Sequence, residues 1–88
     1  GVEMAAFHIV IEVRLREGIA DPEGATIEKA LPALGFSGVS AVRAGKCFRL
    51  TVQAESREHA LDTAHKMCER LLANPVMEDV VVSIDDRG

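Results

Sequence analysis

The sequence predicts a two-layer α+β fold, in which helices pack on one antiparallel sheet, and three features carry this prediction. With 88 residues, 48% of them apolar, the chain is long enough for one domain with one thin core. Segment 7–16 alternates apolar and polar side chains, which is the period of a half-buried strand. Segment 56–73 repeats apolar side chains at steps of three and four, which is the period of an amphipathic helix. A helix with one apolar side needs a surface to lie on, and the alternating segments predict the sheet that provides it.

The first predicted strand runs from Phe7 to Arg16, and a helix that begins at Asp21-Pro22 follows it. The strand's inward side chains are Phe7, Ile9, Ile11, Val13 and Leu15. Asp is a good N-cap and Pro suits the first helical position, while Gly35 has the usual place of a C-terminal cap. Pro32 removes one backbone hydrogen bond, so we expect a bend or a tightened last turn there.

The middle of the chain predicts a β-hairpin. Val39–Ala44 is expected to be a short second strand, and Cys47–Ala54 is expected to be the third. Gly45-Lys46 lies between them, where a hairpin turn belongs.

The C-terminal part predicts a long helix and a fourth strand. Ser56 can accept a hydrogen bond from the first helical turn, and Asn74-Pro75 ends the helix because proline cannot continue it. Met77–Ile84 is rich in β-branched residues and is expected to be a strand. The order β-α-β-β-α-β predicts a ferredoxin-like fold, with a four-stranded antiparallel sheet and two helices on one face. A single domain covers residues 1–88, with flexible ends expected at 1–5 and 85–88.

The fourth strand also predicts self-association. Val80, Val81 and Val82 are consecutive, so both faces of this strand are apolar, and we expect it at a sheet edge. An exposed edge of this kind pairs with another chain unless it is blocked. We therefore expect a homo-oligomer, either a dimer or a tetramer, formed through that edge or through the sheet face without helices.

No group of residues predicts a catalytic, metal or cofactor site. His59 and His65 are six positions apart on one helix, about 240° of rotation, which is too far apart to bind one metal together. Cys47 and Cys68 lack the C-x-x-C spacing that the copper-chaperone version of this fold requires. The sequence therefore predicts an interaction module without catalytic residues of its own.

Charge and composition limit the kinds of partner. The net charge of −4 and the absence of Tyr and Trp argue against nucleic acid. No apolar run approaches the ~20 residues of a membrane span, and two cysteines indicate reduced thiols in a cytoplasmic protein. A basic cluster near the predicted hairpin could meet an acidic partner or a phosphate, or it could be a solvated patch. Its members are Arg43, Lys46 and Arg49.

Six stretches, in order along nearly the whole chain, form a pattern that is specific as a series. They are Asp21-Pro22-Glu23-Gly24, Ile27-Glu28-Lys29-Ala30-Leu31, Leu34-Gly35-Phe36, Val39-Ser40, Val42-Arg43-Ala44-Gly45-Lys46, and Cys68-Glu69-Arg70-Leu71-Leu72-Ala73-Asn74-Pro75-Val76-Met77-Glu78-Asp79. This series resembles the PurS family, the small subunits of phosphoribosylformylglycinamidine (FGAM) synthase.

The resemblance implies a role in the fourth step of purine synthesis. A glutaminase subunit, PurQ, releases ammonia, and an ATP-dependent synthetase subunit, PurL, uses that ammonia to make FGAM. PurS carries no catalytic residue or cofactor; it self-associates and bridges PurL and PurQ, so that ammonia does not escape to water. The residues that the resemblance implies as contact or turn residues are Arg43, Gly45, Lys46, Asn74 and Pro75.

Two other readings of the same element order stay open. An ACT-like regulatory module would bind a small effector at a subunit interface, and an amino acid would raise its melting temperature. A small dimeric enzyme of the ferredoxin-like class would turn over substrate as an isolated chain, although no residues for such chemistry are visible.

Overall fold

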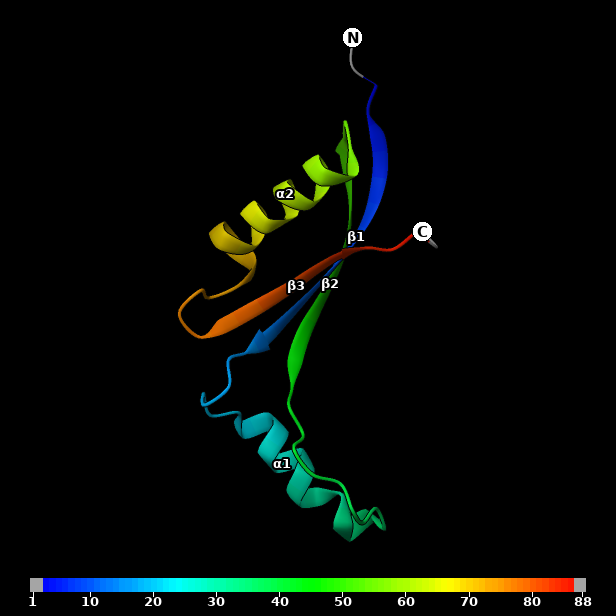
Figure 1. Cartoon of the computed structure of the whole chain (residues 1–88). Helices are drawn as coiled ribbons and strands as arrows, with labels where there is room; N and C mark the ends of the chain where they lie inside the picture. The colour runs from blue at the N-terminus through cyan, green and yellow to red at the C-terminus, as the bar shows by residue number, and fades with distance from the viewer. Residues whose placement is uncertain (1–2, 87–88) are drawn as a thin grey trace.

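The computed structural model describes residues 3–86, which form an α+β fold with one antiparallel sheet (Figure 1). The elements in order are β1 (Ala5–Leu15), α1 (Pro22–Ala30), the 3-10 turn η1 (Pro32–Leu34), β2 (Gly45–Ala54), α2 (Arg57–Met67), the π-helical stretch η2 (Cys68–Leu72) and β3 (Glu78–Ile84). The sheet has three strands in the order β2-β1-β3, so β1 is the central strand. The α+β class is confirmed, whereas the predicted four-stranded sheet is wrong for residues 3–86.

The core lies between β1 and α2. Ile9, Ile11 and Val13 of β1 are at most 1% exposed, and Ala60 and Ala64 of α2 are fully buried. Alanine at these two helical positions lets α2 approach the sheet closely, and α2 contacts all three strands. The Ser56 hydroxyl accepts a hydrogen bond from the His59 N–H at 3.1 Å, which confirms the predicted cap.

The predicted second strand, Val39–Ala44, and the predicted turn at Gly45-Lys46 are wrong. Gly45 lies within β2 and pairs with Arg14, so the chain enters this strand without a hairpin turn. Two backbone N–H groups of segment 39–44 donate to side-chain carboxylates and not to a neighbouring strand. The Val42 N–H donates to Glu28 Oε1 at 2.8 Å, and the Ala44 N–H donates to Asp21 Oδ2 at 2.7 Å. Positive φ at Ala41 (56°) also interrupts the extended conformation that a strand needs.

The prediction that both helices cover the sheet is also wrong, because α1 lies beyond one end of it (Figure 1). We call residues 19–44 the arm; with it the molecule measures 60 × 30 × 14 Å. The predicted N-cap and the tightened last turn are confirmed: Asp21 accepts from the Gly24 N–H, and Pro32 begins η1. Gly35, with a φ of 95°, caps η1 rather than α1, which ends at Ala30.

The two predicted flexible ends, 1–5 and 85–88, are described only in part. Residues 1–2 and 87–88, parts of the ends expected to be flexible, lie outside the described residues. Within those ends, Ala5 begins β1, and the Asp85 N–H donates to the His8 carbonyl at 2.8 Å. No helix within residues 3–86 is long and apolar enough to cross a membrane.

Candidate interaction surface

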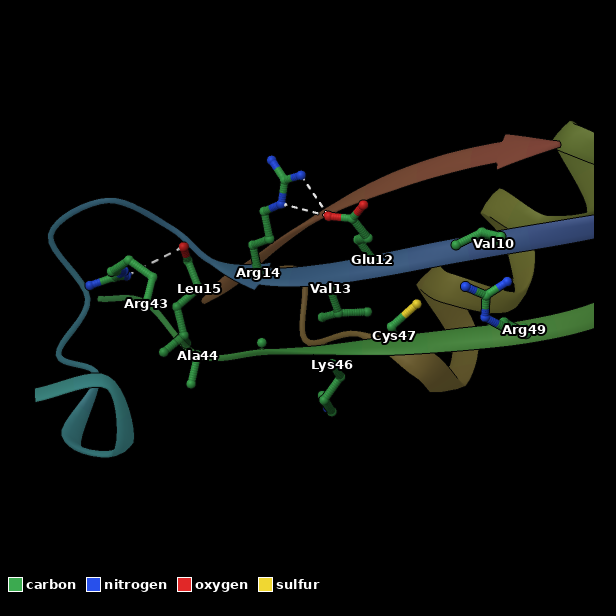
Figure 2. Close-up of a pocket in the computed structure, with 11 residues that line it drawn as sticks. Val10, Glu12, Val13, Arg14, Leu15, Arg43, Ala44, Lys46, Cys47 and Arg49 are labelled. Carbon is green, nitrogen blue, oxygen red and sulfur yellow. Dashed lines mark hydrogen bonds and ion pairs between the residues drawn. The ribbon is translucent and has the colours of Figure 1, made fainter. Parts of the chain in front are cut away.

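A groove lies along β1 and β2, mainly on the sheet face opposite α2, and we call it the sheet groove (Figure 2). It has a volume of about 590 Å³, and its lining continues onto the base of the arm. The charged side chains that line it are Glu12, Arg14, Arg43, Lys46 and Arg49. The Lys46 side chain lies on the α2 face, opposite Val13, so three arginines with one carboxylate make this groove basic (Figure 2). The whole chain, by contrast, has a net charge of −4.

Ion pairs inside and beside the groove leave these cations exposed to a partner. Arg14 Nη2 lies 2.6 Å from Glu12 Oε2, along the same strand (Figure 2). Arg49 Nη1 lies 3.7 Å from Asp85 Oδ2, and the Arg49 side chain is still 73% exposed. Exposed ion pairs of this kind contribute about 0–1 kcal/mol, so a partner can replace them at little cost.

Asp21 fixes the base of the arm. Its carboxylate accepts from the Gly24 N–H at 2.9 Å and from the Ala44 N–H at 2.7 Å, and Arg43 Nε lies 4.0 Å away. These hydrogen bonds, that of Gly24 first, hold the pKa of Asp21 below its ordinary value of 3.8, because they favour the ionised carboxylate. One ionised side chain therefore joins the start of α1 to the residue before β2.

Arg43 ties the arm to the loop after β1. Its guanidinium donates to the carbonyls of Ile19 and Arg16 at 3.3 Å and to that of Leu15 at 3.5 Å, the last of which Figure 2 shows. Gly45 follows at the start of β2, where a Cβ would lie 2.8 Å from the Val13 carbonyl oxygen. Both residues hold the backbone where the arm leaves the sheet.

Glu78 connects Lys46 to the turn before β3. Its Oε2 lies 3.9 Å from Lys46 Nζ, and its Oε1 accepts from the Asn74 N–H at 2.7 Å. Asn74 Oδ1 in turn accepts from the Val76 N–H at 3.0 Å, and Pro75 lies within that turn. The structure therefore places the expected contact or turn residues at one end of the sheet. Arg43 and Gly45 lie where the arm joins it, and Glu78 connects Lys46 to the turn that contains Asn74 and Pro75.

Sequence reasoning missed two kinds of residue at this surface. Asp21 was expected only as a helix cap and Glu78 was given no contact of its own, because their partners are distant in sequence. The arm also exposes large apolar side chains, although its helix was expected to lie on the sheet; they are Ile27, Leu34, Phe36 and Val39. No spacing signal distinguishes a helix that covers its own sheet from one that leaves it.

Potential metal ligands and thiols are dispersed in the described part of the chain. Within residues 3–86, no group of three or more His, Cys, Asp or Glu side chains could hold a metal ion. Cys47 is exposed in the sheet groove, whereas Cys68 is buried, and burial raises the pKa of the Cys68 thiol. The fold and this surface together define a small α+β interaction module.

Comparison with known proteins gives the family. The model of the PurS family, described as phosphoribosylformylglycinamidine (FGAM) synthase, matches residues 8–86. The PurS subunit of Archaeoglobus fulgidus is 48% identical over 68 residues, which cover 77% of this chain and 85% of that one. The chain therefore belongs to the PurS family of FGAM synthase subunits.

Solved structures agree with this membership. The crystal structure of the PurS subunit from Thermotoga maritima matches with a TM-score of 0.88 and 37% identity, over 94% of this chain and 95% of that one. A chain in the structure of PurLQS from the same organism matches with a TM-score of 0.87 and 39% identity, over 93% of this chain and 100% of that one. The arm is thus part of a conformation that similar proteins share.

Proposed function

We propose that this chain is the non-catalytic small subunit of FGAM synthase in purine biosynthesis, and that it bridges the synthetase PurL and the glutaminase PurQ. The observation that carries the proposal is the likeness of nearly the whole chain to a chain of the PurLQS structure. In this proposal the subunit holds no cofactor and works in the cytoplasm.

A bridging role has a clear physical purpose. Ammonia is mostly protonated at neutral pH, and ammonium is not a nucleophile. Holding the two active sites in a fixed relation avoids both the loss to water and the entropic cost of a second encounter. A sheet whose central strand is buried on one side by α2, with a basic groove on the other, provides a rigid body with a surface for a partner.

Reconstitution tests this proposal. PurL and PurQ from the same source are mixed with and without this chain, and FGAM formation is measured with glutamine or with ammonium as the nitrogen source. We expect glutamine-dependent synthesis to require the chain and ammonium-dependent synthesis by PurL to remain. An equal glutamine-dependent rate without the chain would refute the proposal.

The predicted contact residues can be tested in the same assay. Lys46→Glu reverses a cation of β2 whose side chain is 57% exposed and lies 3.9 Å from Glu78 Oε2, beside the sheet groove. Lys66→Glu is the matched control, because Lys66 lies on α2, is 65% exposed and pairs only with Asp62 at 3.1 Å among the described ion pairs. If Lys46 meets an acidic surface of a partner subunit, the first change lowers glutamine-dependent synthesis at limiting chain concentration at least tenfold, and the second does not. Equal effects would exclude Lys46 as a contact residue.

A further inference from the structure

The sheet groove is hollow because two small residues of β2 lie between longer side chains. Gly45 has no side chain, and Cys47 follows two positions later on the same face of the strand. Arg14 lies opposite Gly45 across the strands, and Arg49 lies two positions beyond Cys47. Figure 2 shows the side chains of Arg14, Cys47 and Arg49 on the face away from that of Val13. The volume of about 590 Å³ lies within the range of small-molecule sites, roughly 300–1,000 Å³.

Two arginines lie at the two ends of this hollow. The Arg14 side chain is 60% exposed and the Arg49 side chain is 73% exposed. Arg49 pairs with Val10, four residues before Arg14 on β1, so the two arginine Cα atoms are about 14 Å apart along the strands. A planar guanidinium binds a phosphate or carboxylate group through two parallel N–H···O bonds. The hollow therefore offers two separate positions for anionic groups, with the Cys47 thiol between them.

Carboxylates beside the arginines restrict which anions fit. Glu12 lies between the two positions, and its Oε2 is 2.6 Å from Arg14 Nη2. Asp85 Oδ2 is 3.7 Å from Arg49 Nη1, on a residue outside the groove lining. Because the arginines of both pairs are exposed, a ligand can replace these contacts at little cost. Glu12 repels a ligand that is negatively charged along its whole length, whereas a ligand with an uncharged middle avoids this repulsion.

We propose that the sheet groove binds a small molecule with two anionic groups, phosphate or carboxylate, joined by an uncharged linker. One anionic group lies at Arg14 and the other at Arg49, and the linker passes over Cys47 and half-buried Val10. The groove's lining residues within 3–86 include no aromatic side chain, so charge and length select the ligand and ring stacking does not. The inference concerns the chain alone and does not depend on the proposed function.

Alkylation of Cys47 in the isolated chain tests this site. Iodoacetamide is uncharged, and mass spectrometry gives its rate at exposed Cys47 and at buried Cys68, the internal control. The probes are hexamethylene bisphosphonate and suberate, which join two phosphonates or two carboxylates by the same six-methylene linker. Methylphosphonate and methylene bisphosphonate, with one anionic group or two adjacent ones, are the control anions at equal ionic strength. We expect at least one long dianion to slow alkylation of Cys47 at least threefold, at a concentration where the control anions do not.

Four variants separate binding from a general effect of charge. Arg14→Gln and Arg49→Gln should each remove most of the protection by the long dianions. Arg70→Gln, the same change at an exposed position of η2, is the control and should leave the protection unchanged. Glu12→Gln should strengthen the protection at least twofold, because it frees Arg14 and removes the repulsion. Loss of structure does not give such a gain, and circular dichroism checks that each variant is folded.

Three results would overturn the proposal. Alkylation of Cys47 as slow as that of Cys68 would show that the groove is covered in solution. Equal protection by the long dianions and by the control anions would show a screening effect without a site of defined length. Protection of Cys47 by PurL and PurQ, but by neither long dianion, would make the groove a protein contact instead.

Discussion

The body of this protein, made of the sheet and α2, and its arm use apolar side chains in opposite ways. In the body, Ile9, Ile11 and Val13 are at most 1% exposed. In the arm, Leu34 is 70% and Phe36 is 57% exposed. The structure describes every residue of the arm, and Gly24 is the only one of them that is buried. The body therefore depends on burial for its stability, and the arm does not.

Polar contacts to the backbone give the arm its shape instead. Asp21 and Glu28 accept from N–H groups of segment 42–44, and Arg43 donates to carbonyls of the loop after β1. Such contacts fix a conformation without covering its apolar side. An exposed apolar surface on a segment held in this way is typical of an interaction site.

The largest expected effect is that of removing side-chain volume from the body. Ile11→Ala should lower the free energy of unfolding by about 2–5 kcal/mol, because it leaves a cavity beside α2. Leu34→Ala, the matched change in the arm, should alter it by less than about 0.5 kcal/mol in the dilute isolated chain. Urea denaturation followed by circular dichroism measures both, and similar losses would show that the arm is packed after all.

This difference also explains how much the sequence could predict. The alternation in 7–16 and the helical period after Ser56 report burial, so β1 and α2 were predicted correctly. β3 was predicted from its β-branched residues, and the caps Ser56, Asp21 and Gly35 were predicted from their residue types. Ile27 and Leu34 show the same helical period, yet no sheet covers them. Periodicity shows that a helix has an apolar side but not which surface meets it.

The wrong prediction of a second strand and the unpredicted contacts of the site have the same explanation. Val39–Ala44 has the composition of a strand, but the carboxylates of Asp21 and Glu28 take its N–H groups. Those partners are separated from it by 23 and 14 positions, and no local pattern reveals such pairs. Likewise, the connection from Lys46 through Glu78 to Asn74 joins residues that are distant in sequence, so no local pattern could predict it.

An intermediate effect is expected from Gly24→Ala. A Cβ at this position would lie 2.5 Å from the Val42 carbonyl oxygen and 2.6 Å from Asp21 Oδ2, so α1 and segment 42–44 must separate. Overpacking of this kind costs about 1–3 kcal/mol. Amide hydrogen exchange should quicken at Val42 and Ala44 while the amides of β1 stay protected. Ala25→Gly at the next, exposed position is the control, and unchanged protection of Ala44 in Gly24→Ala would contradict the close approach.

The smallest effect is a pH dependence confined to the arm, and Asp21 supplies it. Hydrogen bonds from Gly24 and Ala44 lower the pKa of Asp21 in the folded chain below 3.8, so at pH 6 the ionised carboxylate stabilises the arm in full. As the pH falls below the ordinary value, the unfolded arm takes up a proton first, and the stabilisation is lost as the pH passes through the lowered pKa. The amide chemical shifts of Gly24 and Ala44 should titrate with a midpoint below 3.8, and those of β1 should not follow them. Asp21→Asn should abolish this titration, because an amide side chain does not ionise in this pH range. A midpoint at or above 3.8 would mean that the carboxylate does not hold the arm to the sheet.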